Sequence, residues 1–349
     1  MQFIKSDTHF DFIGKRRIAF ALSLTMILVS IGSLILHGGP RYGIDFAGGT
    51  LVQIKMSRPT ALNAIKTGLA SIDMGKASVQ SFGSKTDNEF LVRTDKSETT
   101  DKEFTQKIIK ALKASTGSDV QIERVEMVGP QVGKDLQQKA LMALFFSLLF
   151  ITIYISGRFE FKWLLSGVVA GALMGVVYFL SLFNVGTAIL ILCAVIASLI
   201  IFWFLELKYA MGAILALIHD VTIVIGFFSI FNKEFTLPII AALLTIIGYS
   251  LNDTIIVFDR IRENISKQRK AGLPDIINNS INQTLSRTIL TSTTTLFVVV
   301  TLFFFGGGII HDFAFALIVG VGVGTYSSIF VASPILLAWQ GRTKKKLNA

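Results

Sequence analysis

The stretch LPIIAALLTIIGYSLNDTIIVF, residues 237–258, decides the fold of this chain. It carries one charged side chain, Asp253, and it is long enough at 1.5 Å per residue to cross the roughly 30 Å hydrocarbon core of a bilayer. Seven further apolar runs of this kind lie outward from it. They are Ile18–Leu36, Lys139–Ser156, Trp163–Phe183, Thr187–Leu205, Ala210–Ile230, Thr288–Phe305 and Phe313–Trp339. The sequence therefore predicts an α-helical polytopic membrane protein with about eight transmembrane helices.

The composition of the whole chain agrees with this prediction. Of the 349 residues, 52% are hydrophobic and 16% are charged, whereas about 25% are charged in an ordinary soluble domain. The mean hydropathy of +0.63 excludes most soluble folds and disorder. The single cysteine, Cys193, forms no internal disulfide. The first apolar run is longer than the roughly 7–15 residues of a signal-peptide core, so we expect an uncleaved membrane anchor.

The positions of lysine and arginine predict the orientation of the chain in the membrane. Basic residues concentrate in alternate connections, such as 158–162 and 259–270, and near both chain ends. The opposite short loops, 184–186, 231–236 and 306–312, hold only Lys233. Both termini are therefore expected in the cytoplasm, and the formal charge of +10 reflects this topology rather than nucleic-acid binding. Anionic lipid headgroups are the expected partners of the basic residues.

This topology divides the chain into four parts. Residues 1–36 form a cytoplasmic N-terminus and the first transmembrane helix, 37–138 an extracytoplasmic domain, 139–339 the transmembrane bundle and 340–349 a basic cytoplasmic tail. Within 37–138, alternating and helical patterns follow in the order strand, helix, strand, strand, helix, strand. This order predicts a small α+β domain of the ferredoxin-like, split βαβ type.

A weak internal repeat indicates an extra helical hairpin at 163–209. The segment FEFKW (159–163) resembles LELKY (205–209), and FLSLFN (179–184) resembles FFSIFN (227–232). The second copy carries His219 and Asp220 in mid-span, whereas the first carries apolar or small residues there. We therefore interpret the pair as a duplicated, structural insertion, with chance similarity between apolar segments as the alternative.

Ionisable residues inside spans require an explanation, because each costs about 2.5–3.5 kcal/mol on insertion scales. Asp253 shares a helix face with Ser250 and Thr254, and we expect that face to turn away from lipid. Arg287 precedes a series of hydroxyl residues: Thr288, Thr291, Ser292, Thr294 and Thr295. An acid and a base on neighbouring spans favour a proton path. Two alternatives remain. The Arg287 side chain could extend to the lipid headgroups, and Asp253 could only hydrogen bond to a neighbouring helix without titrating.

Two further motifs carry polar chemistry. His219 and Asp220 form a candidate intramembrane polar pair, for which a purely structural role is the alternative. The segment RYGIDFAGGT (41–50) contains glycines that permit positive φ where a membrane helix leads into a strand. The histidines are scattered and nothing resembles a nucleophile with its base, so we expect no metal, no cofactor and no enzymatic activity.

Taken together, these segments resemble the SecF family, the accessory subunits of the bacterial Sec protein-export channel. The resemblance rests on RYGIDFAGG (41–49), RFEFK (158–162), ALIHD (216–220), IGYSLNDTIIVFDRIREN (247–264) and SRTILTS (286–292). By this resemblance, Asp253 and Arg287 match the family's proton-conducting pair. The family's signature before the external domain matches Arg41, Gly43, Asp45, Gly48 and Gly49.

The resemblance implies an RND-like bundle in the bacterial cytoplasmic (inner) membrane. It also implies that the chain works with SecD, using the proton-motive force to assist late translocation of polypeptides. The implied partners are SecD, the SecYEG channel and the exported polypeptide, with YidC and YajC as further candidates. The family usually has six spans, so the hairpin at 163–209 is a departure. The competing hypotheses are an RND-type proton-driven exporter of small molecules or lipids, and a scaffold.

Overall fold

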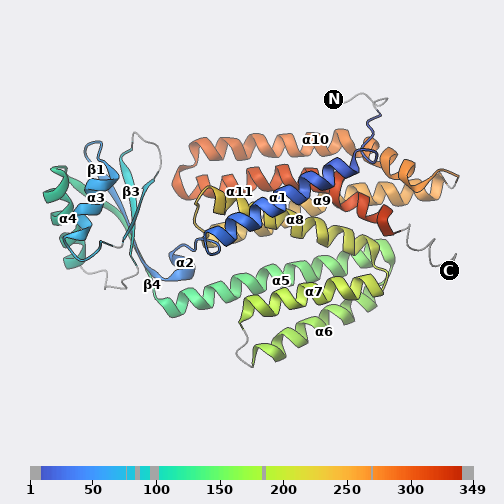
Figure 1. Ribbon diagram of the computed structural model, residues 1–349, viewed down its shortest axis with the longest axis horizontal. Helices are drawn as coiled ribbons and strands as arrows, with labels where there is room; N and C mark the ends of the chain where they lie inside the picture. The colour runs from blue at the N-terminus through green and yellow to red at the C-terminus, as the bar shows by residue number, and fades with distance from the viewer. Residues whose placement is uncertain are drawn as a thin grey trace.

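The computed structural model joins a long helical bundle to a small sheet domain at one end (Figure 1). It describes residues 9–75, 77–82, 87–94, 102–182, 186–268 and 270–339. The basic tail predicted at 340–349 lies outside these residues. The start of the first helix and the end of the last one lie at the end of the bundle opposite the sheet domain.

The bundle contains the apolar helices that the sequence predicts. They are α1 (Arg16–Leu36), α5 (Pro130–Glu160), α6 (Trp163–Ser181), α7 (Thr187–Phe204), α8 (Lys208–Ile230), α9 (Leu237–Lys267), α10 (Leu273–Phe305) and α11 (Gly307–Ser327), which continues through a π-helical turn, η1 (Ser328–Ala332). Seven helices in the described residues are long and apolar enough to cross a membrane, and the described part of α7, Ala188–Phe204, is a shorter apolar helix. The helical membrane fold is therefore confirmed.

Several helices extend beyond the predicted apolar runs. Helix α5 begins at Pro130 rather than near Lys139, and α10 begins at Leu273 rather than near Thr288. The sequence analysis placed boundaries where hydropathy falls, whereas backbone hydrogen bonding continues into polar segments. Each of these helices begins with a proline in its first turn, a position where the missing N–H has no helical partner to lose.

The sheet domain has the strand and helix order that the sequence predicts. Its elements are α2 (Ile44–Ala47), β1 (Gly49–Met56), α3 (Leu62–Ala70), β2 (Ser78–Phe82), β3 (Glu89–Thr94), α4 (Lys102–Thr116) and β4 (Val120–Val128). The antiparallel strands are arranged β2-β3-β1-β4, which is the split βαβ arrangement. Apolar side chains of β1 and β3, including Val52, Ile54 and Val92, are completely buried against those of α3 and α4.

Helix α8 is the central helix of the bundle, whereas α1 and α10 lie at its surface. Within the apolar windows of these helices, 61% of residues are buried in α8 but 17% in α1 and in α10. The core around α8 includes Phe258 of α9, which is fully buried and lies edge-on to Tyr209 with 5.3 Å between ring centroids. The outer face of α10 is therefore left without a partner inside the described chain.

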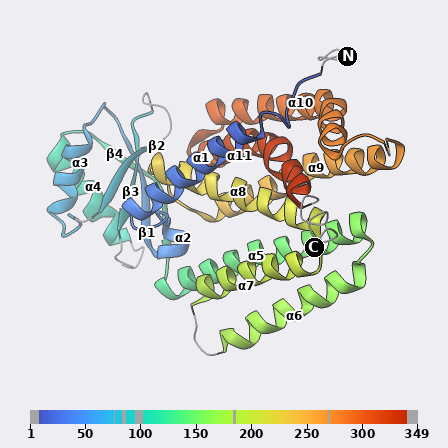
Figure 2. The same ribbon diagram turned by 45° about the vertical axis from the view of Figure 1, so that its right-hand side comes forward.

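The α6–α7 hairpin lies along α5 at the periphery of the bundle, and a second view shows α6 on the outside (Figure 2). The turns at its two ends have the same backbone conformation, with φ of 56° at Phe161 and 57° at Glu206. The turns also contact each other. Lys162 Nζ donates to the Leu205 carbonyl at 2.8 Å, and the Tyr209 N–H donates to Glu160 Oε1 at 2.9 Å. The end of α5 and the start of α8 are thus already adjacent.

We expect the hairpin to be removable. Deleting residues 162–206 joins Phe161 to Leu207 and keeps both the left-handed turn residue and the buried Leu207. Two spans are lost, so the orientation of later helices is unchanged, and the exposed face of α5 is apolar enough to contact lipid. The deleted protein should insert and remain monodisperse in detergent. Deletion of 163–186 is the control, because it removes one span and should prevent correct insertion. Aggregation of both variants alike would contradict this prediction.

Candidate functional site

Asp253 lies on the inward face of α9. Ser250, Asp253 and Thr254 are each 1% exposed, so the predicted polar face turns away from lipid. Neither carboxylate oxygen of Asp253 has a hydrogen-bond partner among the described residues. Buried polar groups in proteins are almost always paired with protein or water. Asp253 is thus a buried carboxylate that no other described residue satisfies.

Arg287 lies on the neighbouring helix α10 but forms no direct ion pair with Asp253 within the described residues. The Arg287 side chain is exposed, whereas Asp253 is buried. The predicted acid and base thus lie on adjacent helices but do not contact each other. The reason is that the α10 face carrying Arg287 points away from the rest of the chain.

The buried polar atoms near Asp253 include further groups without partners. The Tyr249 hydroxyl lies one helical turn from Asp253 on α9, and the Thr288 hydroxyl lies one turn from Ser292 on α10. Neither hydroxyl has a hydrogen-bond partner among the described residues. Three buried polar side chains on two packed helices are therefore left without hydrogen-bond partners among the described residues.

The hydroxyl series after Arg287 divides into two faces. Thr291 and Thr294 are more exposed and donate back to the carbonyls of Arg287 and Leu290, at 3.1 and 2.9 Å. Ser292 faces inward and hydrogen bonds to Thr325 of α11 at 2.7 Å. Hydroxyls that bond their own helix are already satisfied. The inward positions, 288 and 292, are therefore the ones that line the Asp253 side.

His219 and Asp220 contact each other at the centre of the bundle. Their side chains are 3% and 0% exposed, and His219 Nδ1 lies 2.9 Å from Asp220 Oδ1. The second carboxylate oxygen accepts hydrogen bonds from Ser250 at 2.6 Å and from Ser327 at 2.7 Å. Asp220 thus joins α8, α9 and α11 and has all its oxygens occupied. Its surroundings are those of a structural junction, in contrast to Asp253.

The segment Arg41–Gly49 connects the end of α1 to the sheet domain and to the start of α9. Asp45 Oδ2 accepts from the Leu237 N–H at 2.8 Å, which satisfies one of the free donors at the start of α9. Gly43 donates to the Phe235 carbonyl at 2.7 Å. Arg41 donates to Ser78 at 2.8 Å and to Asn232 at 3.2 Å. The segment therefore holds together the end of the bundle that lies next to the sheet domain.

The backbone conformation of this segment explains why two glycines occur in succession, at positions 48 and 49. Gly48 and Gly49 have φ of 75° and 110°, which side-chain-bearing residues rarely adopt. A Cβ on Gly48 would lie 2.9 Å from the Pro130 Cα, where α5 begins. The chain can therefore turn from α2 into β1 while α5 begins directly beside it.

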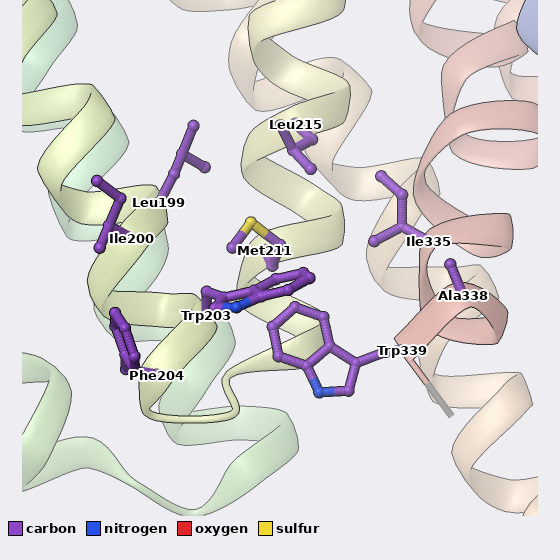
Figure 3. Close-up of a pocket in the computed structure, with 9 residues that line it drawn as sticks. All are labelled: Leu199, Ile200, Trp203, Phe204, Met211, Leu215, Ile335, Ala338 and Trp339. Atoms are coloured by element: carbon purple, nitrogen blue, oxygen red, sulfur yellow. The ribbon is translucent and has the colours of Figure 1, made fainter. Parts of the chain in front are cut away.

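No cluster of three or more potential metal-ligating side chains occurs among the residues that the structure describes. An apolar pocket of about 590 Å³ lies at the end of the bundle away from the sheet domain, between α7, α8 and the last helix (Figure 3). Trp203 and Trp339 lie edge-to-face in it, with 4.9 Å between ring centroids. The pocket contains no ionisable side chain and is separate from Asp253.

Two functional candidates escaped the sequence analysis. Ser327 binds Asp220 but lies in an apolar, glycine-rich span, where only the structure reveals its partner. Glu234 lies in the short loop between α8 and α9 and contacts the sheet domain. The sequence signal that could have identified it is an acidic residue beside Lys233 in an otherwise uncharged loop.

Comparison with known proteins agrees with this architecture. The family model described as "Protein export membrane protein SecD/SecF, C-terminal" matches residues 107–201 and 181–342, and the "SecD/SecF GG Motif" matches residues 33–60. The two overlapping matches of the first model meet inside the α6–α7 hairpin.

Full-length relatives and a solved structure show the same similarity. The protein translocase subunit SecF of Magnetococcus marinus is 42% identical over 353 residues, covering 100% of this chain and 98% of the relative. That of Vibrio alginolyticus is 41% identical, covering 96% of this chain and 91% of the relative. The crystal structure of SecDF, a translocon-associated membrane protein from Thermus, matches with a TM-score of 0.71 and 32% identity. That match covers 97% of this chain and 40% of the SecDF chain.

Proposed function

Because the chain belongs to the SecF family of protein translocase subunits, we propose that it couples proton movement to late protein export across the cytoplasmic membrane. The family relationship makes it an accessory subunit of the Sec machinery rather than an exporter of small molecules. Both termini lie in the cytoplasm in this proposal, and the sheet domain lies outside, where it contacts the emerging polypeptide.

The observation that carries the proton role is the buried, unpartnered carboxylate of Asp253. Asp253 takes up a proton when Arg287 is distant and releases it when the guanidinium approaches, because a nearby positive charge favours the carboxylate. One elementary charge crossing 100 mV releases about 2.3 kcal/mol, which is enough to bias two orientations of an external domain. The proton passes through the inward side of α9 and α10.

The exposed face of α10 supports SecD as the partner that completes the site. The SecDF chain is longer than this chain, which spans 40% of it. Apolar residues are exposed along α10, including Phe297, Val298 and Phe304, on the surface helix that also carries Arg287. A second subunit packed on this face covers that apolar surface and brings Arg287 under its control. SecYEG, YidC and YajC remain predicted partners of the assembled complex.

Replacing Arg287 with Ala tests the relay against a scaffold. We expect Arg287→Ala to copurify with SecD at the parental level, because the apolar surface of α10 is unchanged. Proton-dependent export should fall to the level measured without a proton gradient, since Asp253 then has no group that drives proton release. Export is measured in membrane vesicles with and without a proton-motive force.

The matched control is Arg17→Ala, an exposed arginine on α1 for which the structure gives no ion pair or hydrogen bond among the described residues. It should leave both measurements unchanged. Loss of SecD from the Arg287→Ala complex would favour the scaffold and contradict the relay.

A further inference from the structure

Glu234 is the point where the loop between α8 and α9 contacts the sheet domain and its connecting segment. Its Oε1 lies 3.5 Å from Arg41 Nε and 3.5 Å from Arg93 Nη1. The same oxygen accepts a hydrogen bond from Gln80 at 3.2 Å. One carboxylate therefore binds three donors, from the segment after α1, from β3 and from β2. Its side chain is 19% exposed and that of Arg93 is 14% exposed, so solvent screens these ion pairs less than surface pairs.

Backbone and side-chain contacts surround this cluster. Tyr42 forms a bridge with Phe235, and its carbonyl accepts from the Arg93 guanidinium. The start of α11 contributes as well, because a Cβ on Gly308 would overlap the ring of Phe82 at the end of β2. The ion pair between Lys233 and Asp312 joins the α8–α9 loop to the first turns of α11. The sheet domain thus rests on the α8–α9 loop and on the start of α11.

These two contact points are continuous with the helices of the proposed relay. The loop with Glu234 leads into α9, which carries Asp253, and the start of α11 with Gly308 directly follows α10, which carries Arg287. Asp253 lies 16 residues along α9 from Leu237, or about 24 Å along a straight helix. If α9 and α10 shift relative to each other, the surface on which the sheet domain rests therefore moves with them.

We propose that Glu234 is a positioning residue that holds the sheet domain in one orientation on the external ends of α9 and α10. Through it, movement of these helices reorients the domain that meets the exported polypeptide. The expected effect of Glu234 on export rests on the proposed proton-driven function. The docked orientation itself is argued from the contacts of Glu234 and the residues around it, independently of the relay.

The orientation is measured first, in the full chain. In a Cys193→Ser background, spin labels on Lys66→Cys of α3 and Phe305→Cys at the external end of α10 report the distance between domain and bundle. Both positions are exposed. Glu234→Gln removes the charge but keeps the shape, so we expect the undocked population to rise by about tenfold. Arg93→Gln should act similarly, and the double variant should add little to either single variant.

The export measurement then separates docking from the proton relay. In vesicles that contain SecD, Glu234→Gln should retain the proton flux that Asp253 supports but lose proton-dependent export. Glu123→Gln, an exposed carboxylate on β4 without an ion pair in the described residues, is the control and should change neither property. An unchanged distance distribution in Glu234→Gln, or unchanged export despite undocking, would overturn this inference. Failure of the relay itself would appear instead as undiminished proton-dependent export in a variant of Asp253.

Discussion

Asp253→Asn is expected to insert and fold but to lose the whole proton-dependent part of export. The asparagine side chain has nearly the same shape and carries no titrating group. Neither carboxylate oxygen has a hydrogen-bond partner among the described residues, so the substitution breaks no existing contact. Late translocation should fall to the rate that the same vesicles show after the proton gradient is collapsed.

The control for this result is Asp275→Asn, which makes the same chemical change at an exposed position in the first turn of α10. It should leave the response to the proton gradient intact. The thermal midpoint of Asp253→Asn in detergent should be at least that of the parent, because neither carboxylate oxygen makes a hydrogen bond that the substitution would break. Full proton-dependent export by Asp253→Asn would refute the relay.

Asp220→Ala is expected to have the largest effect on stability. The carboxylate accepts hydrogen bonds from Ser250 and Ser327 and contacts His219. Its removal leaves the Ser250 hydroxyl and His219 Nδ1 without that buried partner, whereas Ser327 keeps the Gly324 carbonyl. Leaving such groups without partners should lower the free energy of unfolding by about 3 kcal/mol. The loss is measured by denaturant unfolding in mixed micelles. It should appear even though no part of the exposed surface is changed.

A variant that lacks one of the hydrogen-bond donors to Asp220 provides a reference value for this loss of stability. Ser250→Ala removes one donor and leaves Asp220 with its other contacts, so it should cost about 1 kcal/mol. If Asp220→Ala were as stable as the parent, Asp220 would not be a structural junction. Its function would then resemble the one proposed for Asp253.

The different surroundings of these two aspartates show where sequence reasoning stops. Both lie in apolar spans, and the sequence marks both as costly to insert. Helical spacing also predicts that Asp253 shares a buried face with Ser250 and Thr254, which the structure confirms. Whether a buried carboxylate is saturated or free depends on other helices. Ser327, which lies 107 residues from Asp220 along the chain, is an example.

The same limit applies to Arg287 and to the hairpin. Sequence spacing places Arg287 near the start of a span and predicts a hydroxyl series after it. The direction of its side chain depends on how α10 packs, and α10 packs with one face outward. The repeated motifs indicate an insertion at 163–209. Only the tertiary contacts, between Tyr209 and Glu160 and between Lys162 and Leu205, show that its two ends meet.

The sequence by itself determined the membrane class, the positions of the spans, the strand and helix order of the sheet domain and the family resemblance. These follow from the length of apolar runs, local periodicity and short motifs, which are properties of neighbouring residues. Only the tertiary structure decided that Asp220 is saturated, that Asp253 is unpartnered and that Glu234 binds the sheet domain. Each of these depends on side chains from helices and strands far apart in the sequence, whose distances no local pattern contains.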